Sequence, residues 1–446
     1  MQFTVEKLTR VEGHGDLKLH AEDGRIREVR FDVTEPLRFF ETMLVGRWWD
    51  RVSEIASRIC GICAVAHTTA SIRATEAAMG IQPSEQTLRL RKIALHGEVI
   101  QSNSLHAYYL AGPDYFGKPD VFHMLDTYPD LVRIALRVKA LGNLLSETIG
   151  GRHVHPLAIV VGGISKPPSK DKLAALLPKL EQCRTDLLAT IPVIKTVRLP
   201  DLERPTEYVA LTHPEEYAFY DGEIRTSAAE SAFAKADYLN VVHEFMTPHA
   251  SAKHSHGASG GPYMVGALAR FNLNFDRLCA EAKTVAAELG MKPPVHRPYM
   301  ITFAQVIECV HCVNDAARLI NEVLDAGIRH EDIRVNVKGG RGVGIVEAPR
   351  GMLIHDYTYD DKARIASANQ VIPTNQNLAN INADLAAIAP RILGEPVDAV
   401  RLKLEMLVRA YDPCISCSAH VIDVKQCYSP QRHEERKGHE DKRRRR

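Results

Sequence analysis

Two pairs of cysteines, far apart in the chain, have the spacing of metal-binding turns. Cys60 and Cys63 stand in the stretch RICGICAVAH, and Cys414 and Cys417 stand in DPCISCSAH. A C-x-x-C turn presents two thiolates on one side of the chain, so two such turns brought together supply four soft ligands to a metal. The sequence therefore predicts a four-thiolate metal centre assembled from both ends of the chain.

The separation of the two pairs indicates which kind of metal site this is. The two knuckles of a zinc ribbon usually lie about 15 to 20 residues apart and help a small unit to fold. Here 351 positions separate Cys63 from Cys414, and a chain of 446 residues can build its own core without zinc. We therefore expect a catalytic metal, with structural zinc as the alternative.

The sequence resembles the large, catalytic subunit of nickel-iron hydrogenases. Its R-x-C-G-x-C-x-x-x-H motif at 58–67 and its D-P-C-x-x-C-x-x-H motif at 412–420 are both complete. The likeness spans residues 8 to 420 and includes four shorter stretches: RVEGH at 10–14, RFFE at 38–41, EAPRG at 347–351 and IPT at 372–374.

The resemblance implies a nickel ion and an iron ion, the iron also carrying carbon monoxide and two cyanides. Carried over residue by residue, Cys60 and Cys414 are terminal nickel ligands, and Cys63 and Cys417 bridge the two metals. The implied activity is the reversible heterolytic cleavage of dihydrogen to protons and electrons. Soft thiolates suit this chemistry because they hold a redox-active metal and share electron density between two metals.

A proton released in a dry site needs an exit, and the resemblance assigns that task to Glu12. This residue matches the family glutamate that takes the proton from the position of Cys414. Glutamate suits the task because partial burial raises the pKa of its carboxyl group. Without the resemblance, Glu12 would be interpreted as a surface carboxylate on an early strand.

Other matched residues surround the metals in the family. Arg350 is expected to hold its guanidinium over the metal pair, although an arginine beside a glycine is otherwise often a solvated or anion-binding residue. The positions expected to shape the centre without binding it are His67, Pro349, Thr374 and Asp412. Thr374 is expected to donate a hydrogen bond to a cyanide, and His67 to a bridging sulfur.

A second metal is implied near the C-terminal motif. Glu41 and His420 match the family ligands of a buried magnesium or iron ion, with a backbone carbonyl near Gln370 as a further ligand. Oxygen ligands and retained water suit magnesium, although a histidine ligand is less typical of it. Glu41 follows two phenylalanines, so a helix residue without a metal is the alternative interpretation.

The electrons must leave through another subunit. Each iron-sulfur cluster needs about four cysteines, and five scattered cysteines remain once four are assigned to the metals. The resemblance implies an iron-sulfur small subunit as partner. The stretch QSNSLHAY at 101–108 is similar to the sequences of the cytoplasmic branch of nickel-iron hydrogenases. In that branch, further subunits pass electrons to NAD(P), a deazaflavin, ferredoxin or a disulfide reductase.

The last residues form a basic extension. Residues 421–446 hold nine Lys/Arg and five Asp/Glu and end in four arginines. In the family, a maturation protease commonly cuts the precursor after the last histidine of the motif, which is the His420–Val421 bond here. We therefore expect a processing segment rather than a nucleic-acid-binding arm.

The sequence patterns of the elements that must position these residues predict an α+β protein that is mainly helical. The resemblance implies the nickel-iron hydrogenase large-subunit fold. Alternation over 17–20, the turn Asp23–Gly24 and apolar residues over 26–33 predict a small N-terminal sheet. Apolar residues at three-and-four spacing predict long helices over 52–79, 84–111, 128–149, 269–290 and 302–327. A strand-rich piece over 332–349 precedes the final helices.

No repeat or composition shift divides the chain before residue 421. We therefore expect one body over 1–420, with a sheet region at 1–50, a helical core at 51–330 and a strand and helix region at 331–420 that closes the metal site. Apolar residues make up 45% and charged residues 25%, which excludes a disordered or fibrous chain. The net charge of +1 does not favour nucleic acid, and no apolar run or secretory pattern appears, so we expect a cytoplasmic protein.

Two further motifs are interpreted as structural. Cys309 and Cys312 lie in an apolar-periodic stretch without a second pair nearby, so we expect an apolar helix face. The glycines of GGRGVG at 339–344 suggest a nucleotide loop, but no helix follows them, and we expect a tight turn that leads to Arg350.

Two other functions are the alternatives to a hydrogenase for the whole protein. They are a non-catalytic scaffold subunit of a respiratory complex and a zinc-stabilised scaffold. The intact cysteines argue against the first.

Overall fold

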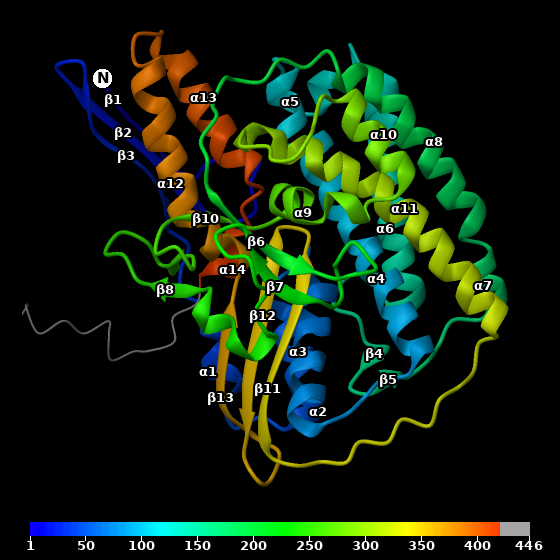
Figure 1. Ribbon diagram of the computed structural model, residues 1–446. Coiled ribbons are helices and arrows are strands. Elements are labelled where there is room, and N and C mark those ends of the chain that lie inside the picture. Colours follow the sequence, from blue (N-terminus) through cyan, green and yellow to red (C-terminus); the bar gives the residue numbers. More distant parts are fainter. Residues whose placement is uncertain (420–446) are drawn as a thin grey trace, which may run out of the picture.

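The computed structural model describes residues 1–419, which form an α+β fold that is mainly helical (Figure 1). The helices are α1 Phe40–Leu44, α2 Trp49–Ala56, α3 Ala64–Met79, α4 Glu85–Ser104, α5 Gly112–Tyr115, α6 Pro129–Gly150, α7 Lys170–Ala174, α8 Leu177–Ile194, α9 Ala267–Asn274, α10 Ala280–Glu288, α11 Ile301–Ala326, α12 Pro373–Ile392, α13 Val397–Ala410 and α14 Ile415–Ser418. The strands are β1 Gln2–Val5, β2 Gly15–Glu22, β3 Arg25–Val33, β4 Ile159–Val160, β5 Gly163–Ile164, β6 Glu207–Thr212, β7 Glu223–Thr226, β8 His243–Phe245, β9 His254–His256, β10 Tyr263–Met264, β11 Gly340–Ala348, β12 Gly351–Tyr359 and β13 Ile365–Val371.

The predicted N-terminal sheet is confirmed. Strands β1, β2 and β3 pair antiparallel in that order, and a turn at Asp23 and Gly24 joins the last two. Alternate residues of β2 are buried, so Leu17 and Leu19 face the core as the alternation predicts. The sheet lies against α12. The backbone N–H of Phe31, on β3, donates to Oδ1 of Asn382, on α12.

The central helices are confirmed, with three local corrections. The predicted helix over 269–290 is divided into α9 and α10, because the chain leaves the α-helix between Asn274 and Ala280. The predicted helix over 52–79 is interrupted between α2 and α3, because the chain must leave the helix to present Cys60 and Cys63 from a loop. The predicted helix over 84–111 changes at its end, where Leu105–Ala111 forms a π-helical segment. Long helices α4, α6, α8 and α11 pack together on one side of the molecule (Figure 1).

A second sheet, β11-β12-β13, was only partly predicted. The sequence indicated strand structure over 332–349, but β11 begins at Gly340, and β12 and β13 were not anticipated. Three of the four glycines of this stretch, Gly340, Gly342 and Gly344, lie in strand β11, so the expectation of a tight turn was wrong. A Cβ at Gly342 would lie 2.1 Å from Ala74 O, and one at Gly344 would lie 2.1 Å from Ala70 O. Glycine is therefore needed because β11 packs directly on the backbone of α3.

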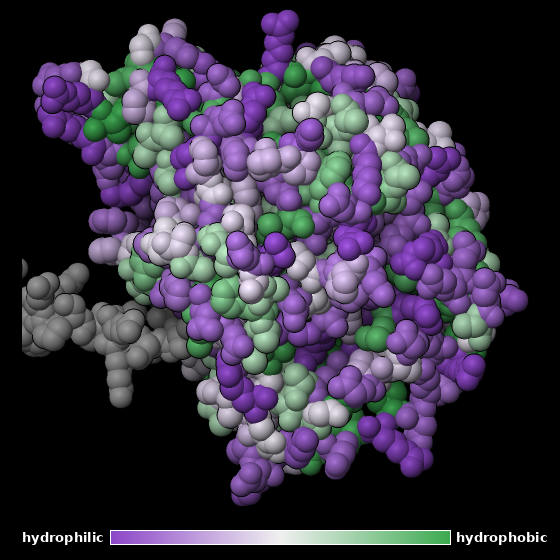
Figure 2. Space-filling view, viewed as in Figure 1, coloured by the Kyte–Doolittle hydropathy of each residue, from purple (hydrophilic) through white to green (hydrophobic). Residues whose placement is uncertain are grey.

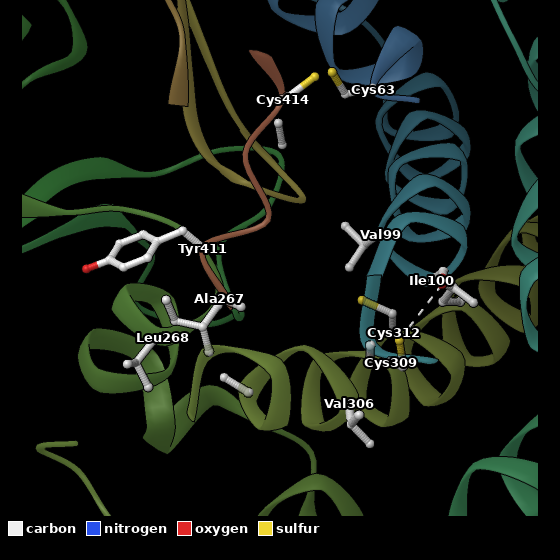
Figure 3. Packing of buried hydrophobic residues seen from close by; sticks show 14 of the residues in the cluster. Cys63, Val99, Ile100, Ala267, Leu268, Val306, Cys309, Cys312, Tyr411 and Cys414 are labelled. Carbon is white, nitrogen blue, oxygen red and sulfur yellow. Dashed lines mark hydrogen bonds between the residues drawn. The ribbon is translucent and has the colours of Figure 1, made fainter. Parts of the chain in front are cut away.

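The apolar interior surrounds α11. Cys309 and Cys312 are buried on this helix, away from Cys63 and Cys414 (Figure 3), and Cys309 Sγ lies 3.9 Å from Ile100 O. Their interpretation as an apolar helix face is confirmed. On the face shown in Figure 2, hydrophobic residues occur as small patches among hydrophilic ones. Within residues 1–419, no helix is both long and apolar enough to cross a membrane.

Candidate metal centre

The four motif cysteines meet in the interior. Their Sγ atoms all lie within 4.8 Å of one another, and the residues are Cys60, Cys63, Cys414 and Cys417. Cys60 Sγ lies 3.5 Å from Cys414 Sγ, and Cys63 Sγ lies 3.7 Å from Cys417 Sγ. Figure 3 shows Cys63 and Cys414 turned toward each other. Over the described part of the chain, this is the one group of three or more His, Cys, Asp or Glu side chains close enough together to hold a metal ion.

The first pair is held by the start of α3. Cys60 has an extended backbone, and the N–H groups of Ile62 and Cys63 both point at Cys60 Sγ from 3.2 Å. The carboxylate of Glu98, on α4, accepts the N–H groups of the first turn of α3 at 2.6 and 2.9 Å. A carboxylate beside the N-terminus of α3 interacts favourably with the positive end of the helix dipole, and its hydrogen bonds fix where α3 begins.

The second pair is held by contacts from three elements. The N–H of Cys414 donates to Thr374 Oγ1 at 2.9 Å, at the start of α12. Glu12 and Cys414 pair as an isolated parallel β-bridge, and the N–H of Ser416 donates to Glu12 Oε2 at 3.0 Å. The guanidinium of Arg38 donates to Ser416 O at 3.0 Å and also to Ile59 O. Arg38 thereby ties the two cysteine loops together.

Four thiols this close cannot all ionise in a dry site without a cation. Hydrogen bonds from the neighbouring thiols, foremost Cys414, lower the pKa of Cys60 well below its ordinary value. Burial raises the pKa of Cys417 well above its ordinary value. A bound metal removes this conflict, because coordination deprotonates thiols and balances their charge. The donor set therefore fits a thiophilic metal.

Arg350 faces the thiols and is held in place by the second motif. Its Nε donates to Asp412 O at 2.7 Å and its Nη2 donates to Asp412 Oδ1 at 2.8 Å. A third donor, Nη1, reaches Ser102 Oγ at 3.3 Å. Burial acts to lower the pKa of Arg350, but the charges of Asp412 and Cys414 raise it overall. Gln305 donates to the other carboxylate oxygen of Asp412 at 3.1 Å.

A small, mainly apolar cavity opens beside the thiols. Its lining residues are Cys63, His67, Ala348, Arg350, Leu353, Ile372, Pro373, Thr374, Cys414 and Cys417. The predicted site residues His67, Arg350 and Thr374 therefore share one wall with the cysteines. Pro349 lies in the turn before Arg350 but is not among the lining residues. Nδ1 of His67 lies 3.1 Å from His355 Nε2, which fixes the plane of the imidazole.

Glu41 and Gln370 form a separate buried group. The N–H of Gln370 donates to Glu41 Oε1 at 2.8 Å, and Lys253 Nζ lies 3.8 Å from the same oxygen. Burial raises the pKa of Glu41 to about 7. Glu41 Oε2 and Gln370 Oε1 are buried without a hydrogen-bond partner. Two such oxygens are what an oxygen-seeking cation or its water would use. The third predicted ligand, His420, lies outside the described residues.

Several residues that shape the centre were missed by sequence reasoning. Glu98 stands within a stretch assigned as apolar-periodic, and a carboxylate on that face was the available signal. No local sequence pattern marked the other three missed residues, because their importance depends on contacts with segments distant in the sequence. These residues are Lys253, His355 and Arg270.

Comparison with known proteins agrees with this geometry. The family of nickel-dependent hydrogenases matches residues 38–133 and 257–420, and a second family, described as HoxL-like, matches residues 2–35. Sulfhydrogenase 2 subunit alpha of Pyrococcus furiosus is 34% identical over 428 residues, which covers 95% of this chain and 100% of the relative. Sulfhydrogenase 1 subunit alpha of the same organism is 32% identical over 424 residues, with coverage of 95% and 98%.

Solved structures share the fold. An NAD+-reducing nickel-iron hydrogenase in its reduced state superposes with a TM-score of 0.85 at 28% identity, covering 94% of this chain and 99% of that one. The Ni-Fe-Se hydrogenase of D. vulgaris Hildenborough has a TM-score of 0.78 at 22% identity, with coverage of 94% and 100%, and shows the fold alone. The chain belongs to the nickel-dependent hydrogenase family and is a large subunit of the nickel-iron type.

Proposed function

We propose that this chain is the catalytic subunit that cleaves dihydrogen reversibly into protons and electrons at its four-cysteine centre. The observation that carries the proposal is the convergence of the four buried thiols within 4.8 Å, with Arg350 facing them. When bound, a nickel-iron pair supplies the heterolytic cleavage and accepts the electrons. In our assignment, Cys60 and Cys414 would be the terminal ligands of nickel, and Cys63 and Cys417 would be the thiolates shared by nickel and iron.

The residues of the chain then have separate tasks. Arg350 provides a fixed positive charge in a water-poor cavity, where electrostatic stabilisation is strongest. Cys414 Sγ holds the released proton, and Glu12 receives it. This order is supported by the β-bridge between Glu12 and Cys414 and by the half-buried position of Glu12.

The cavity beside the thiols supports the proposal that iron carries carbon monoxide and two cyanides. The wall is apolar apart from Arg350, His67 and Thr374, so it suits small diatomic groups with few hydrogen-bond partners. Thr374 Oγ1 accepts the N–H of Cys414, which leaves its own hydroxyl hydrogen free to donate toward a cyanide. His67 retains its proposed role of tuning a bridging sulfur.

We assign the Glu41 group to a magnesium or iron ion. Its support is the pair of partnerless buried oxygens, Glu41 Oε2 and Gln370 Oε1. Glu41→Gln is expected to lose this metal and to keep nickel, as measured by metal analysis of the purified complex. Asp356→Asn, on the adjacent β12 strand, is the matched control. Equal magnesium in wild type and Glu41→Gln would contradict the assignment.

The proposed assembly contains an iron-sulfur small subunit, because the centre needs an outlet for electrons. Cysteines outside the centre, such as Cys183, Cys309 and Cys312, form no metal-binding group with one another within residues 1–419. Exposed apolar side chains on and beside α1, among them Phe39 and Trp48, support a protein interface near the cysteine loops. Further electron-transfer subunits, a maturation protease and a cytoplasmic location complete the proposal. The predicted cleavage bond and the basic extension lie outside the described residues.

Infrared absorption of the purified complex tests the centre directly, with nickel and zinc counted on the same sample. Carbonyl and cyanide bands together with about one nickel per chain are expected. Zinc with no such bands would replace this proposal with a zinc-stabilised scaffold. The respiratory scaffold alternative is not favoured, since all four thiols are present and meet in one cluster.

A further inference from the structure

Arg270 is a buried arginine behind the wall of the metal cavity. It lies on α9, and its side chain has no exposed surface. An arginine carries five N–H donors in a rigid planar fork. Burying such a group is costly unless every donor finds an acceptor. The acceptors of Arg270 therefore show what the residue is built to hold.

All five donors of Arg270 are used. Nε and Nη2 donate to the two carboxylate oxygens of Glu308, on α11, at 2.7 and 2.8 Å. Nη1 donates to Glu347 Oε2 at 2.9 Å. The remaining two N–H groups donate to consecutive backbone carbonyls, Ala348 O at 2.9 Å and Pro349 O at 2.8 Å. One side chain thus joins α9 and α11 to the end of β11.

The two carbonyls stand immediately before Arg350. Helix α9 touches the same turn at a second point, because a Cβ at Gly266 would lie 2.9 Å from Arg350 O. Gly266 has a φ of +104°, which only glycine adopts without strain. The turn from β11 to β12 is therefore fixed from behind at two places, while the guanidinium of Arg350 extends forward to Asp412 and the thiols.

Charge also favours this arrangement. Burial acts to lower the pKa of Arg270, but the carboxylates of Glu308 and Glu347 raise it overall, so the side chain keeps its charge. Glu308 also accepts from Tyr217 and Asn103, which completes the network. The network contains no cysteine, and of its members only Ala348, whose carbonyl accepts from Arg270, lines the thiol cavity.

We propose that Arg270 is a positioning residue for dihydrogen cleavage, which sets the place of Arg350 by fixing the Ala348–Pro349 carbonyls. The inference rests on the proposed role of Arg350 at the metal centre. Arg270 itself touches neither the thiols nor the cavity, so it acts through the turn alone. A lysine at this position cannot replace it, since three donors on one nitrogen cannot reach two carboxylates and two carbonyls at once.

The test is Arg270→Lys in the complete complex. Turnover of dihydrogen oxidation is expected to fall about 100-fold, with nickel and iron content unchanged, because an Arg350 displaced by about 1 Å loses its alignment. The cyanide infrared bands are expected to shift in the same direction as in Arg350→Lys. The double variant Arg270→Lys/Arg350→Lys is expected to be no slower than the slower of the two single variants, because both substitutions disturb the same group, the Arg350 guanidinium. Independent, multiplicative losses would overturn the proposal.

A matched control separates positioning from general stability. Arg91 is also fully buried and donates to both oxygens of Glu76, to Tyr220 and to Val160 O, remote from the thiol cavity. Arg91→Lys is expected to lower the melting temperature while leaving kcat and the infrared bands near wild type. If Arg91→Lys loses activity as Arg270→Lys does, the effect is general and the proposal is wrong.

Two further measurements keep the inference distinct from the proposed function. A crystal structure of Arg270→Lys is expected to show the Pro349–Arg350 turn displaced, whatever the activity, and an unmoved turn would contradict the inference. Absence of dihydrogen oxidation in wild type would instead overturn the proposed function. If Arg270→Lys does not fold, Glu347→Gln provides the same test, since it weakens one bond of Arg270 while keeping the side-chain shape.

Discussion

Glu12 and Cys414 lie side by side in a parallel β-bridge, although they come from opposite ends of the chain. The N–H of Ile415 donates to Glu12 O at 3.0 Å, and the N–H of Ser416 donates to the Glu12 carboxylate. The carboxylate and the cysteine loop therefore move as one unit. This connection holds a half-buried carboxylate against the loop that carries a buried thiol, which is the arrangement our proposed proton path requires.

Replacing Glu12 by glutamine should block proton transfer while preserving the backbone bridge. We expect Glu12→Gln to reduce dihydrogen oxidation by about 100-fold or more, since an amide cannot carry the proton. Nickel and iron content should equal wild type. Glu35→Gln is the control, because Glu35 lies nearby and accepts the N–H of His14. Unchanged turnover in Glu12→Gln would remove Glu12 from the proton path.

Removing one thiol should prevent formation of the centre. Cys414→Ala is expected to yield protein without nickel, because three thiols cannot complete the predicted ligand set. Cys309→Ala removes an equally buried thiol on α11 and should keep full nickel content. Metal analysis of both purified variants makes the comparison. Stoichiometric nickel in Cys414→Ala would show that the ligand assignment is wrong.

The contact between β11 and α3 should be sensitive to a single methyl group. In Gly342→Ala, the added Cβ would lie 2.1 Å from Ala74 O, so strand and helix must separate. We expect a loss of about 1–3 kcal/mol in the free energy of unfolding. Reduced nickel incorporation should accompany it, because Cys63 is the residue that caps the N-terminus of α3. Gly394→Ala meets no atom within 4 Å and should leave both quantities unchanged.

Buried histidines should make the protein less stable in mild acid. Burial lowers the pKa of His254 and of His311 to about 4, whereas the unfolded chain titrates near 6.5. Below about 6.5 the unfolded chain binds protons that the folded protein does not, so stability falls as pH decreases from 6.5 toward 4. This contribution is measured as the difference between wild type and a histidine variant in how the melting temperature changes from pH 7 to pH 5, because the raised pKa of Glu41 acts in the opposite direction in both proteins.

A variant can assign part of that decline to one residue. His311→Asn keeps an acceptor for the N–H of Cys279 and cannot be protonated, so its melting temperature should depend less on pH. His330→Asn alters an exposed histidine and should retain the wild-type slope. Identical slopes in all three proteins would show that buried histidines do not control acid stability.

The sequence by itself determined the chemistry of the centre. The number, type and spacing of Cys60, Cys63, Cys414 and Cys417 predict a four-thiolate site, because ligand identity is a property of the residues. Alternation in the first strands and helical periodicity in the middle of the chain predicted the N-terminal sheet and the central helices for the same reason, since both patterns are local. The division of 1–420 into three regions stays a prediction.

Tertiary structure decided what holds the centre in place. Strands β12 and β13 were missed because their pairing joins segments that have no local signature of burial on one face. The glycines of β11 looked like a turn, and only the approach of α3 explains them. Glu98 and Arg270 are ordinary charged residues in sequence. Their roles exist because folding places a carboxylate at the end of α3 and a guanidinium behind Arg350, where distant acceptors and donors satisfy them in the dry interior.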